Sequence, residues 1–544
     1  NANAAPLTVD TKSHYVPYKK LELIDNENFN ELQLTYIRNI EKKYTSFSKK
    51  SKENIQRYRK VYANNRNVAG FRPVMKEMIY QIVADTGQGS KLRDIDGNEI
   101  LDLTMGFGVN LLGHNPSFIR EALTEELDRG MPLGPMGRLA GSVADQIRNL
   151  TGVERVAFYN SGTEANMVAV RIARASTGKK KIVTFAGSYH GTYDGLLGLS
   201  SIGEDGGLTT IPLAPGIMDS VVSDLIMLNY NQETSLEFIR THANEIAGVL
   251  VETVQSRRPD VQPKDFLKKL RGITEENGIA LIFDEIITGF RICAGGAQEH
   301  FGIQADIVTY GKVVGGGMPI GIVSGKSEYM DCIDGGMWSF GDTSVPPCEQ
   351  KRTFVAGTFS HHPLAMAAAN ASLTYITENK DTLYDKLNNK TNDFVNRVNA
   401  FFEEYLVPIK VVNFGSLFRF VFRGDFEIFF FGLLEKGVYV WEGRNCFFST
   451  EHSDTDIEYV FNAITRTIEE MRQAGYFGEP QLKERTSEDI RSIQIEELPS
   501  VSPMSLIQQR LYTLSSIGKD DPYNLVAVLK VRGTLDLQKF EIVI

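Results

Sequence analysis

Three short apolar runs, each ending just before polar or charged residues, constrain the fold of this chain more than any other feature. They are Arg155–Tyr159, Ile279–Phe283 and Asp306–Tyr310. Their apolar residues are continuous rather than alternating, which is typical of short strands buried on both faces of a parallel sheet. Strand-like runs alternate with helical patterns between about residue 150 and residue 360, which predicts a doubly wound α/β sheet.

The residues just past these runs are the turn Ser161–Glu164, then Asp284, then Lys312. Ligands of open α/β sheets bind outside the carboxyl ends of the strands. An anion-binding turn, a carboxylate and an amine at one sheet edge suit a phosphorylated, cationic ring that carries an aldehyde. The sequence therefore predicts pyridoxal phosphate (PLP) as the cofactor.

The turn Ser161–Glu164 begins a helical pattern, and Ser161 with Glu164 three residues later predicts a capping box. Gly162 lets a ligand approach the backbone closely, and the free amides of the first turn, with Thr163 beside them, favour a phosphate. Taken alone, the motif is better explained by an ordinary capped helix.

Asp284 and Lys312 are the predicted catalytic residues. A carboxylate at the end of a buried strand needs a partner, and Asp284 bound to a pyridine nitrogen would keep that nitrogen protonated. A structural salt bridge or a helix N-cap remains the alternative for this residue. Lys312 lies among glycines that leave room for a bulky adduct, and a desolvated lysine has the lowered pKa that Schiff-base chemistry needs. Val313 excludes the P-loop motif, and a surface lysine is the remaining alternative.

Two further motifs surround the predicted site. Tyr189 and His190 follow the strand-like run Lys181–Phe185, where an aromatic ring can stack on a cofactor ring. For His190 taken alone, a hydrogen-bonded core or loop histidine is the simpler explanation. Thr358, in Gly357–Phe359, offers a second phosphate donor. The pair His361-His362 has no third ligand at metal-binding spacing, so no metal site is predicted.

Composition narrows the class of protein. The net charge of −10 argues against a general affinity for nucleic acid. The four cysteines lie far apart with no CxxC pair, which fits a reducing cytoplasm and argues against a disulfide framework. No apolar run is long enough to cross a membrane, and the amino terminus has no signal region or initiator Met. We therefore expect a cytoplasmic protein that is a segment of a longer chain.

Several stretches occur together in the order that one enzyme family has them: Gly70–Pro73, Leu103–Asn110, Asn160–Ala165, Tyr189–Gly191, Phe283–Glu285, Gly311–Lys312 and Gly357–Phe359. With them, residues 68 to about 477 resemble class III PLP-dependent aminotransferases, especially glutamate-1-semialdehyde aminomutases. The chain is more similar still to aminotransferase domains of hybrid polyketide–nonribosomal peptide synthetases, such as those that make iturin- and mycosubtilin-type lipopeptides.

This resemblance implies a fold-type I homodimer with its active sites at the dimer interface. It assigns Lys312 as the Schiff-base lysine, with Asp284 on the pyridinium, Ile286 under the ring and Tyr189 on the other face. Gly162 and Thr163 would hold the phosphate, with Ser161 and His190 nearby and Thr358 reaching it from the partner subunit. Arg72 and Glu442 fall where the aminomutases bind substrate. The run Gln255–Arg258 departs from other class III enzymes, and no arginine follows Glu442 at their carboxylate-binding spacing, so the amino donor is not predicted.

The predicted organisation follows from these motifs. We expect an α/β fold in which a large domain with a mostly parallel sheet is followed by a smaller α+β domain. The predicted parts are a polar linker (1–60) with one amphipathic stretch around Phe29 to Tyr44, an N-terminal segment of the aminotransferase (61–130), a large PLP-binding domain (131–375), a small domain (376–478), a second linker (479–498) and the truncated start of a condensation domain (499–544).

The predicted activity is transfer of an amino group from an amino acid to a β-ketoacyl thioester on an acyl carrier protein, giving a β-amino acyl chain for lipopeptide biosynthesis. The adjoining condensation domain motivates the tethered acceptor, because the new amine would be its next nucleophile. An aminomutase of the glutamate-1-semialdehyde type and a non-catalytic docking module are the alternatives. The expected partners are a second copy of the chain, the carrier protein and neighbouring synthetase domains, with no nucleic acid or membrane.

Overall fold

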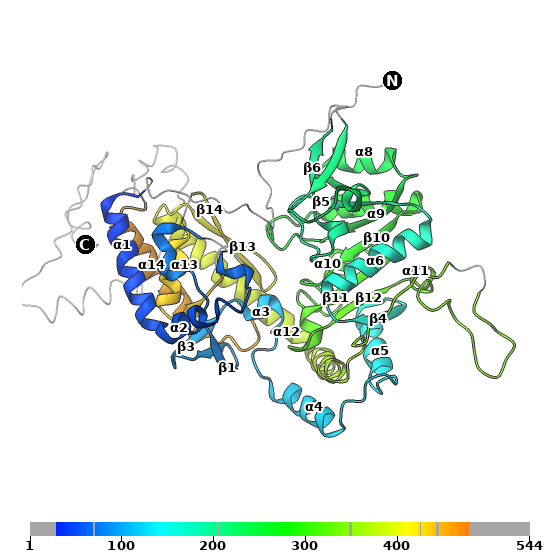
Figure 1. Ribbon diagram of the computed structural model, residues 1–544, viewed down its shortest axis with the longest axis horizontal. Coiled ribbons are helices and arrows are strands. Elements are labelled where there is room, and N and C mark those ends of the chain that lie inside the picture. Colours follow the sequence, from blue (N-terminus) through cyan, green and yellow to red (C-terminus); the bar gives the residue numbers. More distant parts are fainter. Residues whose placement is uncertain are drawn as a thin grey trace, which may run out of the picture. The chain divides into compact units, whose positions relative to one another are not determined.

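The structure is a computed structural model that describes residues 29–68, 71–203, 207–347, 351–424, 426–441 and 445–477 (Figure 1). All of them belong to one compact unit, Asn1–Pro480. The predicted linker 479–498, the predicted condensation-domain segment 499–544 and Glu442 lie outside the described residues. Within the described part, no helix is long and apolar enough to cross a membrane.

A seven-stranded sheet in the order β4-β12-β11-β10-β9-β5-β8 forms the large domain, and β12 is antiparallel to both of its neighbours. The pairs β10–β11, β10–β9, β5–β9 and β5–β8 are parallel. The strands are β4 (Arg155–Tyr159), β5 (Lys181–Phe185), β8 (Leu225–Leu228), β9 (Ile246–Val251), β10 (Ala280–Asp284), β11 (Ile307–Gly311) and β12 (Gly321–Gly325). The strands predicted from the three apolar runs are thus confirmed within one residue at each end.

Both faces of this sheet are buried, which explains why its strands are continuously apolar. Alternate side chains of β10 enter different clusters: Ile282 packs with Ala169 of α6, whereas Phe283 packs with Leu270 of α9. Helices on the two faces confirm the doubly wound sheet. The helices and the hairpin of this domain are α4 (Ser117–Asp128), α5 (Ala140–Thr151), α6 (Gly162–Thr177), η4 (Asp194–Leu196), β6 (Gly198–Ile202), β7 (Leu208–Pro212), α7 (Asp219–Val222), α8 (Glu233–Thr241), α9 (Lys264–Glu276), α10 (Gly296–Phe301), η5 (Lys312–Gly315) and α11 (Ser327–Met330).

The amphipathic stretch expected around Phe29 to Tyr44 is a helix, and a second helix follows it inside the expected linker. Where the sequence suggested a linker, α1 (Glu31–Phe47) begins at an Asn30 capping box and buries Tyr36 and Tyr44, and α2 (Lys49–Tyr58) follows it. One apolar stripe on α1 was enough to dock it on the small domain, although its overall composition is polar. The remaining elements before residue 110 are η2 (Asn65–Asn67), η3 (Pro73–Met78), β1 (Ala84–Gln88), β2 (Lys91–Asp94), β3 (Glu99–Asp102) and α3 (Met105–Gly108).

A 42-residue helix, α12 (Pro363–Glu404), joins the two domains and crosses the predicted boundary at residue 375. It begins at Pro363, and the His362 side chain accepts a hydrogen bond from the amide of Leu364, so the histidine caps a helix. The small domain follows with β13 (Ile409–Phe414), β14 (Leu417–Phe422), α13 (Ile428–Glu435), β15 (Val438–Tyr439), β16 (Cys446–Phe447) and α14 (Asp454–Gln473). Because β15 pairs in parallel with β3, the N-terminal segment and the small domain share one sheet.

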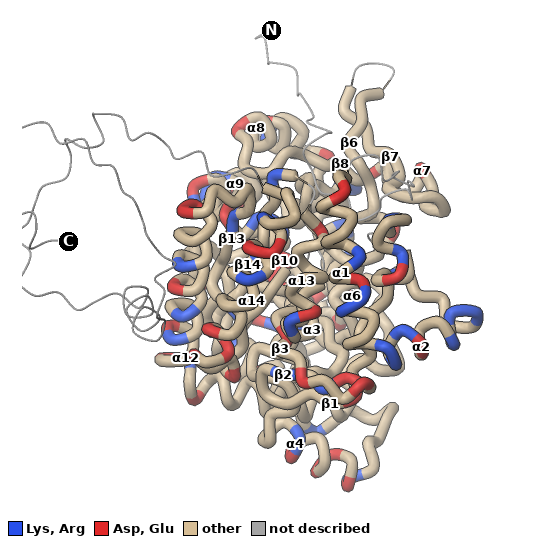
Figure 2. Tube along the Cα trace, turned by 90° about the vertical axis from the view of Figure 1, so that its left-hand side faces the viewer, with Lys and Arg blue, Asp and Glu red and all other residues tan. Residues whose placement is uncertain are grey.

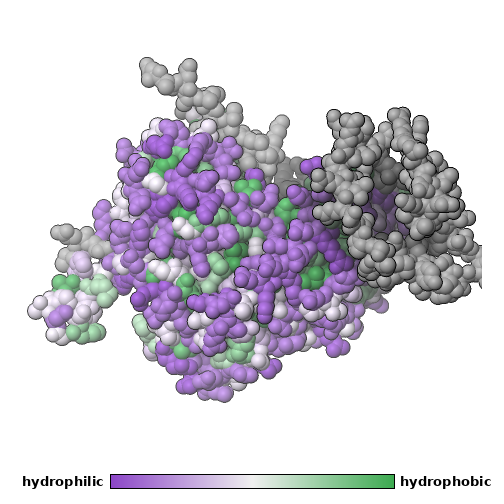
Figure 3. Space-filling model, turned by 180° about the vertical axis from the view of Figure 1, so that it is seen from behind, coloured by the Kyte–Doolittle hydropathy of each residue, from purple (hydrophilic) through white to green (hydrophobic). Residues whose placement is uncertain are grey.

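A loop after α11 carries large apolar side chains in solvent. Met337 is 74% exposed and Phe340 is 90% exposed, with the Trp338 ring against that of Phe340. The loop projects from the large domain in Figure 1, and from behind it is a lobe with apolar atoms at the left edge of an otherwise largely hydrophilic face (Figure 3).

Candidate active site

A cavity of about 290 Å³ opens where the strands of the large sheet end, as the sequence predicted. It brings together most of the predicted site residues with several that were not predicted. The lining residues are Val109, Asn160, Ser161, Gly162, Thr163, Asn166, Tyr189, His190, Gly191, Glu252, Asp284, Ile286, Ile287, Lys312, Met318, Pro319 and Ile320.

Asp284 is held in one orientation at the end of β10. It is buried, its Oδ1 accepts the amide of Ile286 at 3.1 Å, and its Oδ2 lies 2.7 Å from Nδ1 of His190. Asn166 of α6 donates to the same Oδ2 at 2.8 Å, while its own Oδ1 accepts from Thr309 at 2.8 Å. These hydrogen bonds fix the buried carboxylate and offset the free energy lost when it leaves water. The sequence analysis missed Asn166, although it lies one turn after Gly162 on the apolar face of α6.

Lys312 follows β11 in a left-handed backbone conformation, with φ of 41°. Such strain at a non-glycine residue recurs at active sites. The side chain opens onto the cavity, and desolvation by the protein packed around its amine lowers the pKa of Lys312. The nearby Asp284 and Glu252 act in the opposite direction. A lowered pKa keeps part of the amine unprotonated and nucleophilic.

The part of the cavity that is suited to bind an anion lies at the start of α6. Ser161 is the N-cap and its hydroxyl accepts the amide of Glu164 at 3.2 Å, but the predicted capping box is only half formed. Glu164 accepts the amide of Asn160 at 2.7 Å instead of the Ser161 amide. The first amides of α6 have no carbonyl four residues earlier in the helix, so they can bind an anion. A methyl group on Gly191 would lie 2.4 Å from Thr163 Oγ1, so this glycine lets the Tyr189–Gly191 loop approach the helix.

Ile286 forms the floor of the cavity. A Cβ atom built on Gly162 would lie 3.1 Å from the Ile286 side chain, and one built on Gly311 would lie 3.3 Å from it. The two glycines therefore leave room for this side chain, and the expected position of Ile286 under the ring stays a prediction.

Glu252, at the end of β9, was also missed. Its carboxylate accepts the amides of Tyr189 at 3.1 Å and Ser256 at 3.3 Å, and it thereby fixes the loop that presents the Tyr189 ring to the cavity. Burial raises the pKa of Glu252 to about 7. The guanidinium of Arg257 lies 5.8 Å from the centre of the Tyr189 ring, so a cation stands beside the cavity.

Arg291 is a fully buried cation behind the site. It donates to the carbonyl of Gly108 at 2.7 Å, to the Ser416 hydroxyl at 2.9 Å and to the carbonyl of Phe448 at 3.3 Å. Burial lowers the pKa of Arg291 to about 9. These bonds join the loop after β10 to the small domain and to the turn before Val109.

Three predicted residues do not line this cavity. The Arg72 guanidinium pairs with Glu427 of the small domain at 3.3 Å. Thr358 is exposed. A Cβ atom built on its neighbour Gly357 would lie 3.9 Å from Nδ2 of Asn160. Glu442 lies outside the described residues. The substrate roles of Arg72 and Glu442 and the reach of Thr358 to a partner subunit stay predictions. Among the described residues, no group of His, Cys, Asp or Glu has metal-binding geometry.

Residues 72–450 match the family described as aminotransferase class-III. The chain belongs to this family. Glutamate-1-semialdehyde 2,1-aminomutase of Alkaliphilus oremlandii is 36% identical over 403 residues, which cover 71% of this chain and 91% of that protein. The enzyme of the same name from Persephonella marina is 37% identical, covering 75% of this chain and 95% of that protein.

Solved structures agree with this assignment. An omega-transaminase from Sphaerobacter thermophilus has a TM-score of 0.69 and 28% identity, covering 78% of this chain and 98% of that one. A β-phenylalanine aminotransferase from Variovorax paradoxus has a TM-score of 0.68 and 27% identity, covering 80% and 97%. The aminotransferase therefore has the fold-type I architecture that the sequence predicted, and it is a PLP-dependent enzyme.

The cavity of the aminotransferase fits PLP. A buried, hydrogen-bonded carboxylate, a lysine with a lowered pKa and the open first turn of α6 surround one space. His190 Nε2 is buried and has no hydrogen-bond partner in the described structure. These are the donor and acceptor types that a pyridine nitrogen, an aldehyde and a phosphate require.

Proposed function

We propose that the aminotransferase moves an amino group from an amino acid to a β-ketoacyl chain carried as a thioester on an acyl carrier protein. The observation that carries the amino-transfer part is the convergence of Lys312 and Asp284 on one cavity in a class III enzyme. The thioester acceptor rests on the resemblance to synthetase domains. The apolar side of the cavity, which includes Val109, Ile287 and Met318, supports an acyl chain.

Each proposed role uses a group at the cavity. When bound, PLP supplies an electron sink for the carbon that loses or gains a proton. Lys312 Nζ would hold the cofactor and, once the amino donor displaces it, move a proton to and from the substrate carbon. Asp284 would keep the ring nitrogen protonated, and His190 and Asn166 would hold Asp284 in place.

The phosphate would lie at the first turn of α6, held by Ser161, Gly162 and Thr163. Tyr189 would cover one face of the ring and Ile286 the other, with Glu252 fixing the Tyr189 backbone.

We also propose a homodimer, as is typical of class III aminotransferases. In it, the loop with Met337 and Phe340 packs on a second copy, because such exposed apolar side chains gain most from being covered. Thr358 would complete the partner's phosphate site.

The test is an assay of purified enzyme with a β-ketoacyl carrier protein and a panel of amino donors, read by intact mass. A gain of one amino group in place of the keto oxygen, dependent on the donor and lost in Lys312→Ala, supports the proposal. Turnover of free keto acids but not of the thioester would refute the carrier-bound acceptor.

The names of the relatives favour one alternative, an aminomutase that moves the amine within one substrate. Conversion of glutamate-1-semialdehyde without any separate amino donor would support it over the proposed reaction.

A further inference from the structure

The helix α2 and the two residues after it are strongly basic on a chain with a net charge of −10. Residues 49–60 contain Lys49, Lys50, Lys52, Arg57, Arg59 and Lys60 against the single acid Glu53. All of these basic residues except the half-buried Lys52 are exposed. In Figure 2, α2 extends from the right side of the molecule, and its basic segments outnumber the acidic ones. This segment is named the basic helix below.

The basic helix makes little contact with the rest of the protein. Ser51 is its only buried residue among those described, and the Asp96 carboxylate anchors its first turn by accepting the amides of Lys50 at 2.6 Å and Ser51 at 2.9 Å. A salt bridge of 2.6 Å joins Lys52 to Glu77. The carboxyl-terminal half of the helix therefore projects with its basic side chains in solvent.

Large apolar and aromatic side chains accompany this charge. Tyr58 is 43% exposed, and just beyond the helix Val61 is 81% exposed and Tyr62 is 61% exposed. Tyrosine and arginine together are enriched where proteins bind proteins.

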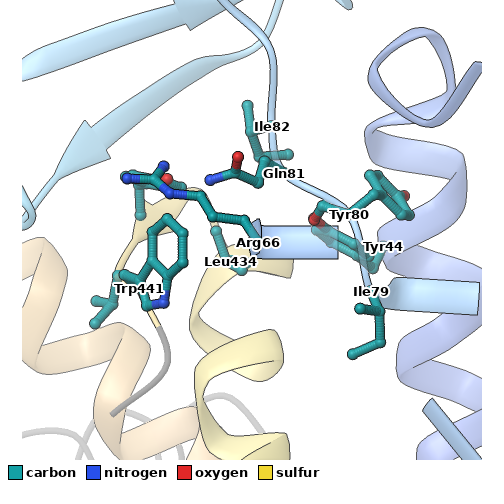
Figure 4. Close-up of a pocket in the computed structure, with 10 residues that line it drawn as sticks. Tyr44, Arg66, Ile79, Tyr80, Gln81, Ile82, Leu434 and Trp441 are labelled. Atoms are coloured by element: carbon teal, nitrogen blue, oxygen red, sulfur yellow. The ribbon is translucent and has the colours of Figure 1, made fainter. Parts of the chain in front are cut away.

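The chain leads from the basic helix towards the active site. After α2 it reaches Arg66 in η2, whose guanidinium lies 3.7 Å from the centre of the Trp441 ring and 5.0 Å from that of Phe107. Figure 4 shows Arg66 beside Trp441, on one side of a small cavity of about 30 Å³. Phe107 lies two residues before Val109, which lines the active-site cavity. Arg66, the buried Trp441 and Phe107 thus form one packed cluster between the segment that follows the basic helix and the turn before Val109.

The turn that carries Phe107 is strained. Met105 has φ of 45° and Phe107 has φ of 57°, both in the left-handed region, and Arg291 holds the turn through the carbonyl of Gly108. Left-handed conformations at non-glycine residues persist where the surrounding structure fixes them for a function. Here they place the Phe107 ring, which is 37% exposed, against Arg66 and Trp441.

We propose that the basic helix is the docking surface for an acidic protein, and that the bound partner's acyl chain reaches the active site past Arg66 and Phe107. The inference rests on the proposed function, in which this partner is the carrier protein. Charge complementarity favours a protein over a polyanion, since the patch spans one short helix while the overall charge of −10 repels extended nucleic acid.

The test compares two forms of one substrate. The parent enzyme and the variant Lys50→Glu/Arg57→Glu/Arg59→Glu receive the same β-ketoacyl chain, either on an acidic acyl carrier protein or on free pantetheine. A matched control, Lys264→Glu/Lys268→Glu/Lys380→Glu, reverses three exposed charges on α9 and α12 instead. We expect kcat/KM for the carrier-bound chain to fall about ten-fold or more in the first variant only, since reversed rim charges repel the partner. The pantetheine reaction should be unchanged, and circular dichroism should show equal melting temperatures.

An equal loss with pantetheine, an equal loss in the control variant, or no loss at all would overturn the proposal. Calorimetric binding of the unloaded carrier protein tests the surface even where no acyl chain is aminated, so a failure of the proposed function is distinguishable. Unchanged carrier binding in the charge-reversed variant, with lost binding of single-stranded RNA or phosphatidylserine vesicles, would instead assign the surface to one of those partners.

Discussion

Replacing Asn166 with alanine tests whether the hydrogen bonds around Asp284 serve the cofactor. Asn166 is 1% exposed and makes three hydrogen bonds, to Asp284 Oδ2 at 2.8 Å, to the carbonyl of His190 at 3.1 Å and from Thr309 Oγ1 at 2.8 Å. The bond to the carboxylate is charge-assisted and is worth about 2 kcal/mol. If this hydrogen bond orients Asp284 towards the ring nitrogen, its loss should raise the dissociation constant of PLP roughly 30-fold.

The same substitution leaves buried polar groups without a partner, so the free energy of unfolding of the apoprotein should also fall, by about 3 kcal/mol. Both quantities are measurable separately: PLP affinity by absorbance titration of the apoprotein, and stability by urea denaturation without PLP. The control is Thr177→Ala on the same helix, whose hydroxyl donates to the carbonyl of Ala173 at 2.7 Å and accepts the amide of Lys179 at 3.3 Å, with no bond to Asp284. A PLP dissociation constant within two-fold of the parent's would refute the role of Asn166 in holding Asp284, even if stability fell as expected.

Three further predictions follow from burial and backbone conformation. Because burial lowers the pKa of Lys312, the unfolded state binds more protons than the folded state between the lowered and the ordinary lysine pKa. The apo Lys312→Met protein should therefore melt at a higher temperature than the apo parent at pH 7, and the difference in melting temperature should shrink towards pH 10. A difference that is absent, or that grows with pH, contradicts the buried amine. Burial raises the pKa of Glu252 to about 7, so the folded state binds more protons than the unfolded state between pH 4.5 and 7. The parent should therefore lose up to about 3 kcal/mol of unfolding free energy relative to Glu252→Gln as the pH rises from 4.5 to 8. The same pH dependence of urea denaturation in both proteins would argue against this. Gly191→Ala places a methyl group 2.4 Å from Thr163 Oγ1 at φ of 89°, whereas the control Gly97→Ala, at φ of 96°, meets no atom within 4 Å. Both variants should lose about 1 to 3 kcal/mol of unfolding free energy from backbone strain, but only Gly191→Ala should also weaken PLP binding. Equal PLP affinities of the two variants would refute a phosphate site at Thr163.

The sequence by itself determined the large sheet and the chemistry at its edge. Continuous apolar runs can be satisfied only by burial on both faces, so β4, β10 and β11 were predictable, and with them the meeting of Ser161, Asp284 and Lys312.

Only the tertiary structure decided which residues hydrogen-bond to Asp284 and to the Tyr189 loop. Asn166 and Glu252 each carry a local signal, a polar residue on an apolar helix face and a carboxylate after a buried strand. That signal does not name their partners, because only the fold brings Asp284 and the Tyr189 amide beside them. The same holds for α1, whose amphipathic pattern is visible in the sequence but whose docking on the small domain is not, and for the half-formed cap, where Asn160 competes for Glu164. Hydrogen bonds and packing between segments far apart in the chain depend on three-dimensional distance, which a sequence pattern of short period does not record.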